Sequence, residues 1–340
     1  MNRTIIIAEA GVNHNGSMDI AKKLIDAAAN AGADYVKFQT FKADRLVSKE
    51  AKKAIYQDKN INDGDDSQYN MLKRLELSDS MHHELIDYCN LKEIKFLSSG
   101  FDEESIDYLD NLGINIFKIP SGEITNKPYL RHIARKGKDV ILSTGMADMK
   151  EIGDALAVMY NENLKPEQIT VLHCNTEYPT PMEDVNLHAM ITIQEAFGVA
   201  VGYSDHTKGI EVPIAAVALG ATIIEKHFTL DRNLSGPDHT ASLEPDELKT
   251  MVSAIRNIEL AISGDGFKVT SKSEKPNMVI ARKSIHVSSD LSAGTVLKPE
   301  HISMKRPGDG ISPMLLETVL GKTIIHDLTE DHKLSWSDII

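Results

Sequence analysis

Short apolar runs alternate along this chain with segments whose apolar residues recur every three or four positions, as Ile20, Leu24, Ala27 and Ala28 do. Eight such runs lie at residues 4–11, 35–41, 95–100, 116–123, 140–146, 169–174, 199–206 and 221–229. A strand followed by a helix, repeated eight times, predicts an α/β fold, the parallel (β/α)8 barrel. A doubly wound open sheet is the alternative, but no glycine-rich dinucleotide loop follows the first run.

The pattern changes after the last long helical segment. The stretch "SGDGFKVTSKSEKPN", residues 263–277, is rich in Gly, Ser and Lys and is typical of a linker. Short strand-like runs separated by Gly, Pro and Asp turns follow it. The sequence therefore predicts a barrel over residues 1–265, a linker over 266–281 and a small β-rich domain over 282–340, which needs a surface to pack on.

The amino-acid composition and net charge indicate which kinds of binding partner are not expected. Hydrophobic residues make up 41% and charged residues 26% of the 340 residues, as in globular proteins, and the formal net charge is −13. Because no basic block stands out, binding to nucleic acid or to an anionic membrane surface is not expected. An anionic small substrate would need a locally positive pocket.

The cysteines and the N-terminus indicate a cytoplasmic protein. Cys89 and Cys174 are far apart and in no paired motif, which favours a reducing compartment. The first apolar run, Ile5 to Ala8, leads directly into Glu9 and lacks the length of a secretory signal. No apolar run approaches the roughly 20 residues that a membrane helix needs.

Charged and hydroxyl residues gather where the expected strands end, which is the end of a (β/α)8 barrel that carries the chemistry. A buried lysine ammonium is costly without an anionic partner, so Lys37 and Lys118 together with neighbouring hydroxyls suggest a phosphate or carboxylate ligand. The polar residues at these ends are Glu9, Lys37, Gln39, Ser98, Ser99, Lys118, Ser121, Glu123, Ser143, Thr144, Asn175, Thr176, Ser204, His206, Glu225 and His227.

Two histidines occupy equivalent places at the ends of the seventh and eighth runs, in "GYSDHT" and "EKHFTL". If these strands are neighbours, His206 and His227 can share a divalent metal that keeps open positions for water and substrate. Asp205 and Glu225 are candidates for orienting the two ligands. A hydrogen-bonded core histidine is the plainer interpretation of either residue alone.

Several linked motifs carry a resemblance to a known family. "IIAEAGVNHNG", "VKFQTF", "FKIPSGEI", "ILSTGM", "HCNTEYPTPMEDVNL", "GYSDHT", "EKHFTLDR" and "SGPDH" occur in an order and spacing that resemble the bacterial sialic acid synthase family. In the tail, "ARKS", "AGT" and "KRPGDGISP" resemble that family's C-terminal antifreeze-like (SAF) domain. The resemblance covers essentially the whole chain.

The resemblance implies condensation of phosphoenolpyruvate with an N-acetylated mannosamine-type sugar, with release of phosphate by C–O cleavage. It implies Mn(II), with Mg(II) or Co(II) as alternatives, on His206 and His227. It places phosphoenolpyruvate against Lys37, Ser99, Lys118, Ser121, Ser143, Ser204 and either Asn175 or Thr176. "SSGF" stands here where many members have "STPF", so the hydroxyl of Ser99 is kept in an altered loop.

Glu9 and Glu123, at the ends of the first and fourth runs, are the candidate proton-transfer residues, because a partly desolvated carboxylate can have its pKa raised into a useful range. Glu9 is the favoured activator of water and Glu123 a sugar contact or acid, with the two roles exchangeable. The resemblance assigns the sugar-binding residues. Gln39, Tyr178 and Asp238 match sugar-binding positions, and Arg306 matches an arginine that a partner subunit contributes, which implies a domain-swapped homodimer. The charged stretch Asp44 to Tyr69 is expected to form a mobile loop over the site.

The acceptor and some alternative functions stay open. N-acetylmannosamine would give N-acetylneuraminic acid, the first expectation, and 2,4-diacetamido-2,4,6-trideoxymannose would give N,N'-diacetyllegionaminic acid. A metal-dependent pyruvate aldolase has less use for phosphate donors, and a Schiff-base aldolase on Lys37 or Lys118 leaves the histidines unexplained. A noncatalytic sugar- or ice-binding protein would not need the polar set at the strand ends.

Overall fold

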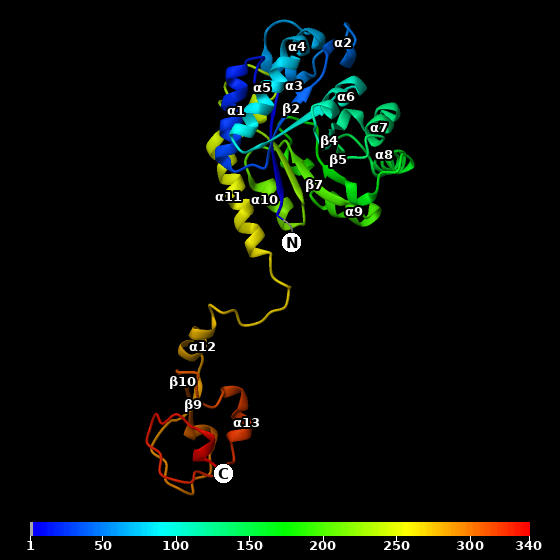
Figure 1. The fold of residues 1–340 in the computed structure, drawn as a ribbon. Coiled ribbons are helices and arrows are strands. Elements are labelled where there is room, and N and C mark those ends of the chain that lie inside the picture. Colours follow the sequence, from blue (N-terminus) through cyan, green and yellow to red (C-terminus); the bar gives the residue numbers. More distant parts are fainter. Residues whose placement is uncertain (1–2) are drawn as a thin grey trace. The chain divides into compact units, whose positions relative to one another are not determined.

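The computed structural model describes residues 3–340. Contacts divide this part of the chain into two compact units, one ending at Ser263 and one running from Gly264 to Ile340 (Figure 1). The sequence places its barrel boundary two residues later, after residue 265. The exact domain limits stay a prediction.

The first unit is a closed barrel of eight parallel strands arranged in chain order. This confirms the predicted (β/α)8 fold, and every one of the eight expected runs contains a strand. The strands are β1 (Ile5–Gly11), β2 (Tyr35–Thr40), β3 (Lys95–Gly100), β4 (Ile116–Ile119), β5 (Asp139–Ser143), β6 (Ile169–His173), β7 (Ala200–Asp205) and β8 (Ile223–His227).

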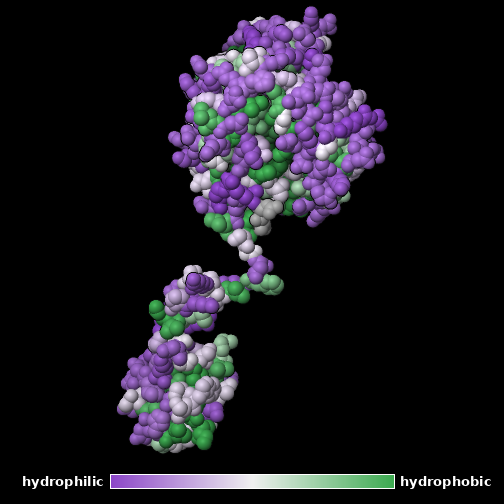
Figure 2. All heavy atoms as spheres, viewed as in Figure 1, coloured by the Kyte–Doolittle hydropathy of each residue, from purple (hydrophilic) through white to green (hydrophobic). Residues whose placement is uncertain are grey.

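Helices surround the strands (Figure 1). They are α1 (Met18–Ala31), α2 (Ala43–Leu46), α3 (Ile55–Ile61), α4 (Gln68–Leu75), α5 (Asp79–Leu91), α6 (Glu103–Asn111), α7 (Lys127–Ala134), α8 (Met149–Asn161), α9 (His188–Phe197), α10 (Glu211–Ala218) and α11 (Pro245–Ala261). The outward surface of this layer is largely hydrophilic (Figure 2). No helix within residues 3–340 is long and apolar enough to cross a membrane.

Local sequence signals explain where the helices begin and end. Ser17 caps α1 by accepting a hydrogen bond from the backbone N–H of Ile20, and Gly32 ends it with a left-handed backbone at φ 81°. The apolar face of α1, including Leu24 and Ile25, is fully buried against the barrel. Capping residues fix the ends of the helix, and burial of this face stabilises it.

Most strand residues are buried on both faces, because side chains alternate between the barrel interior and the helix layer. Residues Ile224 and Lys226 of β8 therefore lie on the side opposite to Glu225 and His227. This alternation decides which polar side chains reach the interior at the C-terminal end of the barrel.

The connection between β2 and β3 differs from the sequence expectation. The stretch from Asp44 to Tyr69 was expected to be a mobile loop, but it contains most of α2, all of α3 and the start of α4. A separate small core stabilises these short helices, formed by Val12, Phe41, Ala43, Met71, Leu72 and Leu75. Apolar packing therefore orders a segment whose sequence is dominated by charge.

The second unit has its own core, which includes Ile285, Val287 and Leu334. An antiparallel pair, β9 (Ser284–Val287) with β10 (Ile302–Lys305), accompanies α12 (Lys275–Ala281) and α13 (Leu316–Val319). This confirms the expected small β-rich domain. The predicted linker, residues 266–281, is helical over its second half because α12 lies there.

Candidate active site

A pocket of about 570 Å³ lies at the C-terminal ends of the barrel strands. Fifteen of the residues selected from the sequence line it: Glu9, Lys37, Gln39, Ser99, Lys118, Ser121, Glu123, Ser143, Thr176, Tyr178, Ser204, His206, Glu225, His227 and Asp238. Residues from all eight strands or from the loops after them thus meet in one cavity.

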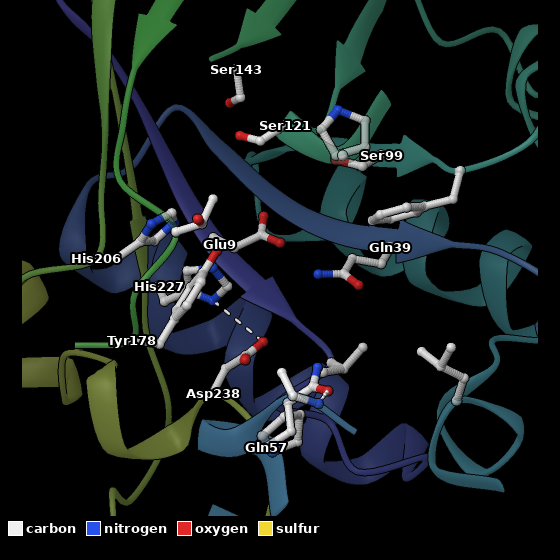
Figure 3. A pocket seen from close by; sticks show the side chains of 18 of the residues that line it. Glu9, Gln39, Gln57, Ser99, Ser121, Ser143, Tyr178, His206, His227 and Asp238 are labelled. Carbon is white, nitrogen blue, oxygen red and sulfur yellow. Dashed lines mark hydrogen bonds and ion pairs between the residues drawn. The ribbon is translucent and has the colours of Figure 1, made fainter. Parts of the chain in front are cut away.

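Figure 3 shows how the labelled side chains are distributed in this pocket. Ser99, Ser121 and Ser143 lie at one end of the view, and Asp238 lies at the opposite end. Glu9 lies between the two ends. The pocket therefore has a hydroxyl-rich end and a separate end that holds a carboxylate.

Buried charges form the floor of the pocket. Lys37 Nζ lies 2.6 Å from Glu9 Oε2 and 3.5 Å from Glu225 Oε2, while Lys118 Nζ lies 3.4 Å from Glu225 Oε1. All four side chains are almost fully buried. We call these four residues the charged floor, and its two ammonium groups and two carboxylates balance each other in charge.

Burial and pairing shift the pKa values of the charged floor. Burial raises the pKa of Glu9 to about 7, even though Lys37 opposes this shift. Burial would also raise the pKa of Glu225, but attraction to Lys118 and Lys37 outweighs it and lowers the pKa. Burial lowers the pKa of Lys118. Glu9 is therefore the carboxylate of this set that most readily takes and gives a proton near neutral pH.

Hydroxyl groups surround the two lysines. Lys37 Nζ donates to Ser99 Oγ at 3.0 Å, and Ser204 Oγ donates to Glu225 Oε1 at 2.8 Å. Ser143 Oγ is buried without a hydrogen-bond partner. A buried hydroxyl without a partner is costly, so Ser143 is suited to donate to a bound anion.

Two glycines allow these groups to approach one another. A Cβ at Gly145 would lie 2.4 Å from Thr176 Cγ2 and 2.9 Å from Ser121 Oγ, and the backbone N–H of Gly145 donates to Ser121 Oγ. Gly11, at φ +52°, lies in the left-handed region, and a Cβ there would lie 3.1 Å from Glu9 Oε1. A side chain at either position would push the site residues apart.

The two histidines lie next to each other, as the sequence predicts. β7 pairs with β8 so that Asp205 is opposite Lys226, and the next residues, His206 and His227, follow in register. Their ring centroids are 5.4 Å apart. Burial lowers the pKa of His206 to about 4 and that of His227 well below its usual value, so both imidazoles are neutral near pH 7.

The chemistry of this pair fits a divalent metal. His206 Nδ1 donates to the backbone carbonyl of Asn175, which fixes the ring and leaves Nε2 available. His227 Nδ1 is buried without a hydrogen-bond partner. Within residues 3–340, no group of three His, Cys, Asp or Glu residues is placed to hold a metal. A metal held here would depend on two protein nitrogens and on water or substrate for its other positions.

Aromatic rings connect the histidines to the β2–β3 connection. The Tyr178 ring lies 4.1 Å from that of His206, and the Tyr56 ring stacks on Tyr178 at 5.1 Å. Asp238 Oδ2 lies 3.9 Å from His227 Nδ1, and burial raises the pKa of Asp238 to about 6. Tyr178 and Asp238, which the resemblance assigns to sugar binding, thus border the histidines.

Glu123 has a different environment from Glu9. It lines the pocket from the turn after β4 and is partly exposed. Its Oε2 atom accepts a hydrogen bond of 2.6 Å from Asn126 Nδ2. The two candidate proton-transfer residues therefore differ in burial and in partners.

Five of the residues selected from the sequence do not line this pocket: Ser98, Thr144, Asn175, Asp205 and Arg306. The Asn175 side chain accepts from the backbone N–H of Glu177 at 2.7 Å and does not line the pocket, whereas Thr176 does. Arg306 belongs to the second unit, where its exposed side chain donates through Nε to the Ala281 carbonyl at 3.0 Å.

Sequence reasoning missed or misplaced some neighbours of the site. Glu225 and Asp205 were both expected to orient the histidines, but only Glu225 lies in the pocket. Asp205 pairs with the buried Lys226 at 2.6 Å on the other side of the strands. The alternation of side chains along β7 and β8 predicts that Asp205 and Glu225 lie on opposite sides of the strands. Tyr56 and Gln57 line the pocket from α3, a position that the sequence does not indicate because its charge pattern predicts a loop there.

Comparisons with known proteins identify the family of the chain. The NeuB family profile matches residues 24–268, and the SAF domain profile matches residues 282–340. An N,N'-diacetyllegionaminic acid synthase from Campylobacter jejuni is 54% identical over 331 residues, covering 97% of this chain and 98% of that protein. A protein of the same name from Legionella pneumophila is 47% identical, covering 98% and 94%.

A solved structure supports the same relationship. The N-acetylneuraminic acid (sialic acid) synthetase from Leptospira borgpetersenii, in complex with citrate, is 35% identical and superposes with a TM-score of 0.70, covering 82% of this chain and 90% of that chain. The resemblance that the motifs carry is thereby confirmed. The chain belongs to the NeuB family and carries a SAF domain at its C-terminal end.

Proposed function

We propose that this protein is an N,N'-diacetyllegionaminic acid synthase, which condenses phosphoenolpyruvate with 2,4-diacetamido-2,4,6-trideoxymannose and releases phosphate. The charged floor beside two neutral histidines is the observation that carries the reaction class. The 54% and 47% identities to proteins of this name favour this acceptor over N-acetylmannosamine, the first expectation from the sequence.

Phosphoenolpyruvate would bind at the hydroxyl-rich end of the pocket. Lys37 and Lys118 supply two cations, and serine and threonine hydroxyls supply donors, which suits a ligand with a carboxylate and a phosphate. Thr176 is the better of the two open candidates for a phosphate contact, because it lines the pocket whereas Asn175 Oδ1 accepts a hydrogen bond from the backbone N–H of Glu177. The other donors in this proposal are Ser99, Ser121, Ser143 and Ser204.

The aldehyde end of the open-chain sugar would lie at the histidines. His206 and His227 would hold the divalent metal, Mn(II) in this proposal, with Mg(II) or Co(II) as alternatives. A metal bound there would polarise the aldehyde oxygen and make the carbonyl carbon electrophilic. Tyr178, Gln39 and Asp238 would bind the sugar's hydroxyl and amide groups, since their side chains border this part of the pocket.

Carbon–carbon bond formation would join C3 of phosphoenolpyruvate to the aldehyde carbon, convert the aldehyde oxygen to a hydroxyl by uptake of a proton, and leave positive charge at C2. Glu9 would accept a proton from the water that adds to C2, because burial brings the pKa of this carboxylate to about 7. The C2–O bond to phosphate then breaks, and the phosphate leaves against Lys37 and Lys118. Glu123, partly exposed at the rim, would contact a sugar hydroxyl.

Arg306 enters the proposal through a second copy of the chain. As the resemblance implies, a domain-swapped homodimer would bring Arg306 of a partner subunit to the acetamido group of the sugar. The exposed guanidinium is available for such a contact. Arg306→Ala should raise the KM for the acceptor far more than the KM for phosphoenolpyruvate, and the opposite pattern would remove this part of the proposal.

The direct test is phosphate release from phosphoenolpyruvate with Mn(II), measured with both sugars in parallel. A higher kcat/KM with the diacetamido sugar supports the proposal, and a higher kcat/KM with N-acetylmannosamine makes the protein a sialic acid synthase instead. Turnover with pyruvate in place of phosphoenolpyruvate, without phosphate release, would identify an aldolase.

A further inference from the structure

The β2–β3 connection, residues 43–75, supplies one side of the pocket with uncharged groups only. Its aliphatic contributions are Leu46, Val47, Ala54, Met71, Leu72 and Leu75. We call the pocket-lining residues of this connection the neutral wall. It contrasts with the charged floor, on which every one of the four side chains ionises.

No charged residue of the connection lines the pocket, and several of them pair with one another. Lys53 Nζ lies 2.6 Å from Asp63 Oδ1, Arg74 lies 2.8 Å from the other oxygen of Asp63, and Lys73 lies 3.3 Å from Asp44. Although the segment is rich in lysine and aspartate, only its aliphatic, amide and phenol side chains line the pocket.

The neutral wall also carries amide and phenol groups. Gln57 and Gln68 line the pocket, and Tyr56 stacks on Tyr178. In Figure 3, Gln57 lies with Asp238 at the end opposite to the three serines. The wall can therefore hydrogen-bond to an amide while presenting aliphatic surface beside it.

The position of the neutral wall relative to the histidines determines which part of a bound sugar the wall can contact. Tyr178 contacts the His206 ring, and Tyr56 of the wall contacts Tyr178 in turn, so the wall is two ring contacts from the candidate metal ligands. A six-carbon sugar with its aldehyde at the histidines directs its C4 to C6 end away from them. With the sugar placed in this way, the neutral wall would face that end.

We propose that the neutral wall selects the acceptor, by taking a sugar with a methyl group at C6 and an acetamido group at C4. This inference rests on the proposed function and names the residues that decide its acceptor. N-acetylmannosamine has hydroxyls at C4 and C6, and a hydroxyl that faces Leu46 and Val47 rather than the amides of Gln57 and Gln68 would lose water without gaining a partner. A sugar 6-phosphate would meet no cation on this wall.

Two variants of the wall and one matched control test the inference. Val47→Thr and Leu46→Asn introduce polar groups into the wall, and Ile55→Thr makes the same kind of change on α3 at a side chain that is 91% exposed and does not line the pocket. kcat/KM is measured for the diacetamido sugar and for N-acetylmannosamine, with the KM for phosphoenolpyruvate as a check on the charged floor.

In each wall variant, the ratio of kcat/KM for the diacetamido sugar to that for N-acetylmannosamine should fall about tenfold, the usual effect of one group in an apolar pocket. The KM for phosphoenolpyruvate should stay unchanged, and Ile55→Thr should leave the ratio unchanged. Val47→Thr preserves side-chain volume, so its result stands even if Leu46→Asn does not fold.

The outcomes separate this inference from the proposed function. A wild-type protein that prefers the diacetamido sugar, with the same ratio in both wall variants, overturns the inference alone. An equal fall of the ratio in Ile55→Thr also overturns it. A wild-type protein that prefers N-acetylmannosamine, or releases no phosphate with either sugar, overturns the proposed function and this inference together.

Discussion

Replacing Asp205 with Asn should destabilise the barrel by about 3–5 kcal/mol, because it leaves a buried ammonium without its counter-charge. Asp205 Oδ2 lies 2.6 Å from Lys226 Nζ, and both side chains have 0% exposure. The pair joins the ends of β7 and β8, immediately before the two histidines. It contributes no atom to the pocket.

The hydrogen bonds that remain to Asp205 or Lys226 after the other is replaced decide which variant loses more stability. Without Asp205, Lys226 keeps the Thr207 carbonyl as an acceptor, so Asp205→Asn should lie at the upper end of the range. Without Lys226, Asp205 still accepts from Thr207 N at 2.9 Å and Thr207 Oγ1 at 3.1 Å, so Lys226→Met should lie at the lower end. The double variant should cost less than the sum of the two, since neither charge is then left alone.

Urea unfolding followed by far-ultraviolet circular dichroism measures these costs, because most of the helices belong to the barrel unit. Trp336, the single tryptophan, lies in the second unit and its fluorescence reports that unit separately. The matched control is Asp154→Asn in the pair Lys150–Asp154, which has the same 2.6 Å separation but exposures of 80% and 67%. An Asp205→Asn variant as stable as this control would refute the reasoning.

Three further predictions concern the site and acid stability. His227→Ala should abolish phosphate release and weaken Mn(II) binding measured by calorimetry; full activity in an EDTA-treated wild type would contradict the metal role. Glu9→Gln should lower kcat about a hundredfold or more with little change in KM, and an unchanged kcat would assign Glu9 to structure. Burial lowers the pKa of His14 to about 4, so the unfolded chain binds the extra proton between pH 6.5 and 4 and stability falls as pH drops through this window. In urea unfolding at several pH values, His14→Gln should therefore show a slope smaller by about 1.4 kcal/mol per pH unit, and an identical slope would show that His14 titrates normally.

The barrel was predictable because its signal is repeated eight times, so an error at one strand does not change the fold. Strand ends were less predictable. The run at residues 116–123 was expected to continue as a strand, but β4 ends at Ile119 because Pro120 has no N–H for the ladder, and a 3-10 turn follows. The same local chemistry places Ser121 and Glu123 on a turn that lines the pocket.

Most of the pocket was predictable from the rule that strand ends in this fold meet at one end. The role of Glu225 was underestimated, because its partners Lys37 and Lys118 come from β2 and β4, which are distant in sequence. Pairing across the barrel interior depends on which strands face each other, and a single strand's pattern does not contain that information.

The neutral wall could not be predicted for a different physical reason. Helices α2, α3 and α4 have 4, 7 and 8 residues, too short to show a clear apolar period, and isolated helices of this length are unstable in water. Tertiary packing around Phe41 and Met71 orders them, and only then do their charges turn toward one another and their carbon and amide groups toward the pocket. The amino-acid composition averages over all residues of the segment, whereas a ligand contacts only the side chains that line the pocket once the helices have packed. The catalytic strand ends can therefore keep one reaction while changes in this connection alter the acceptor.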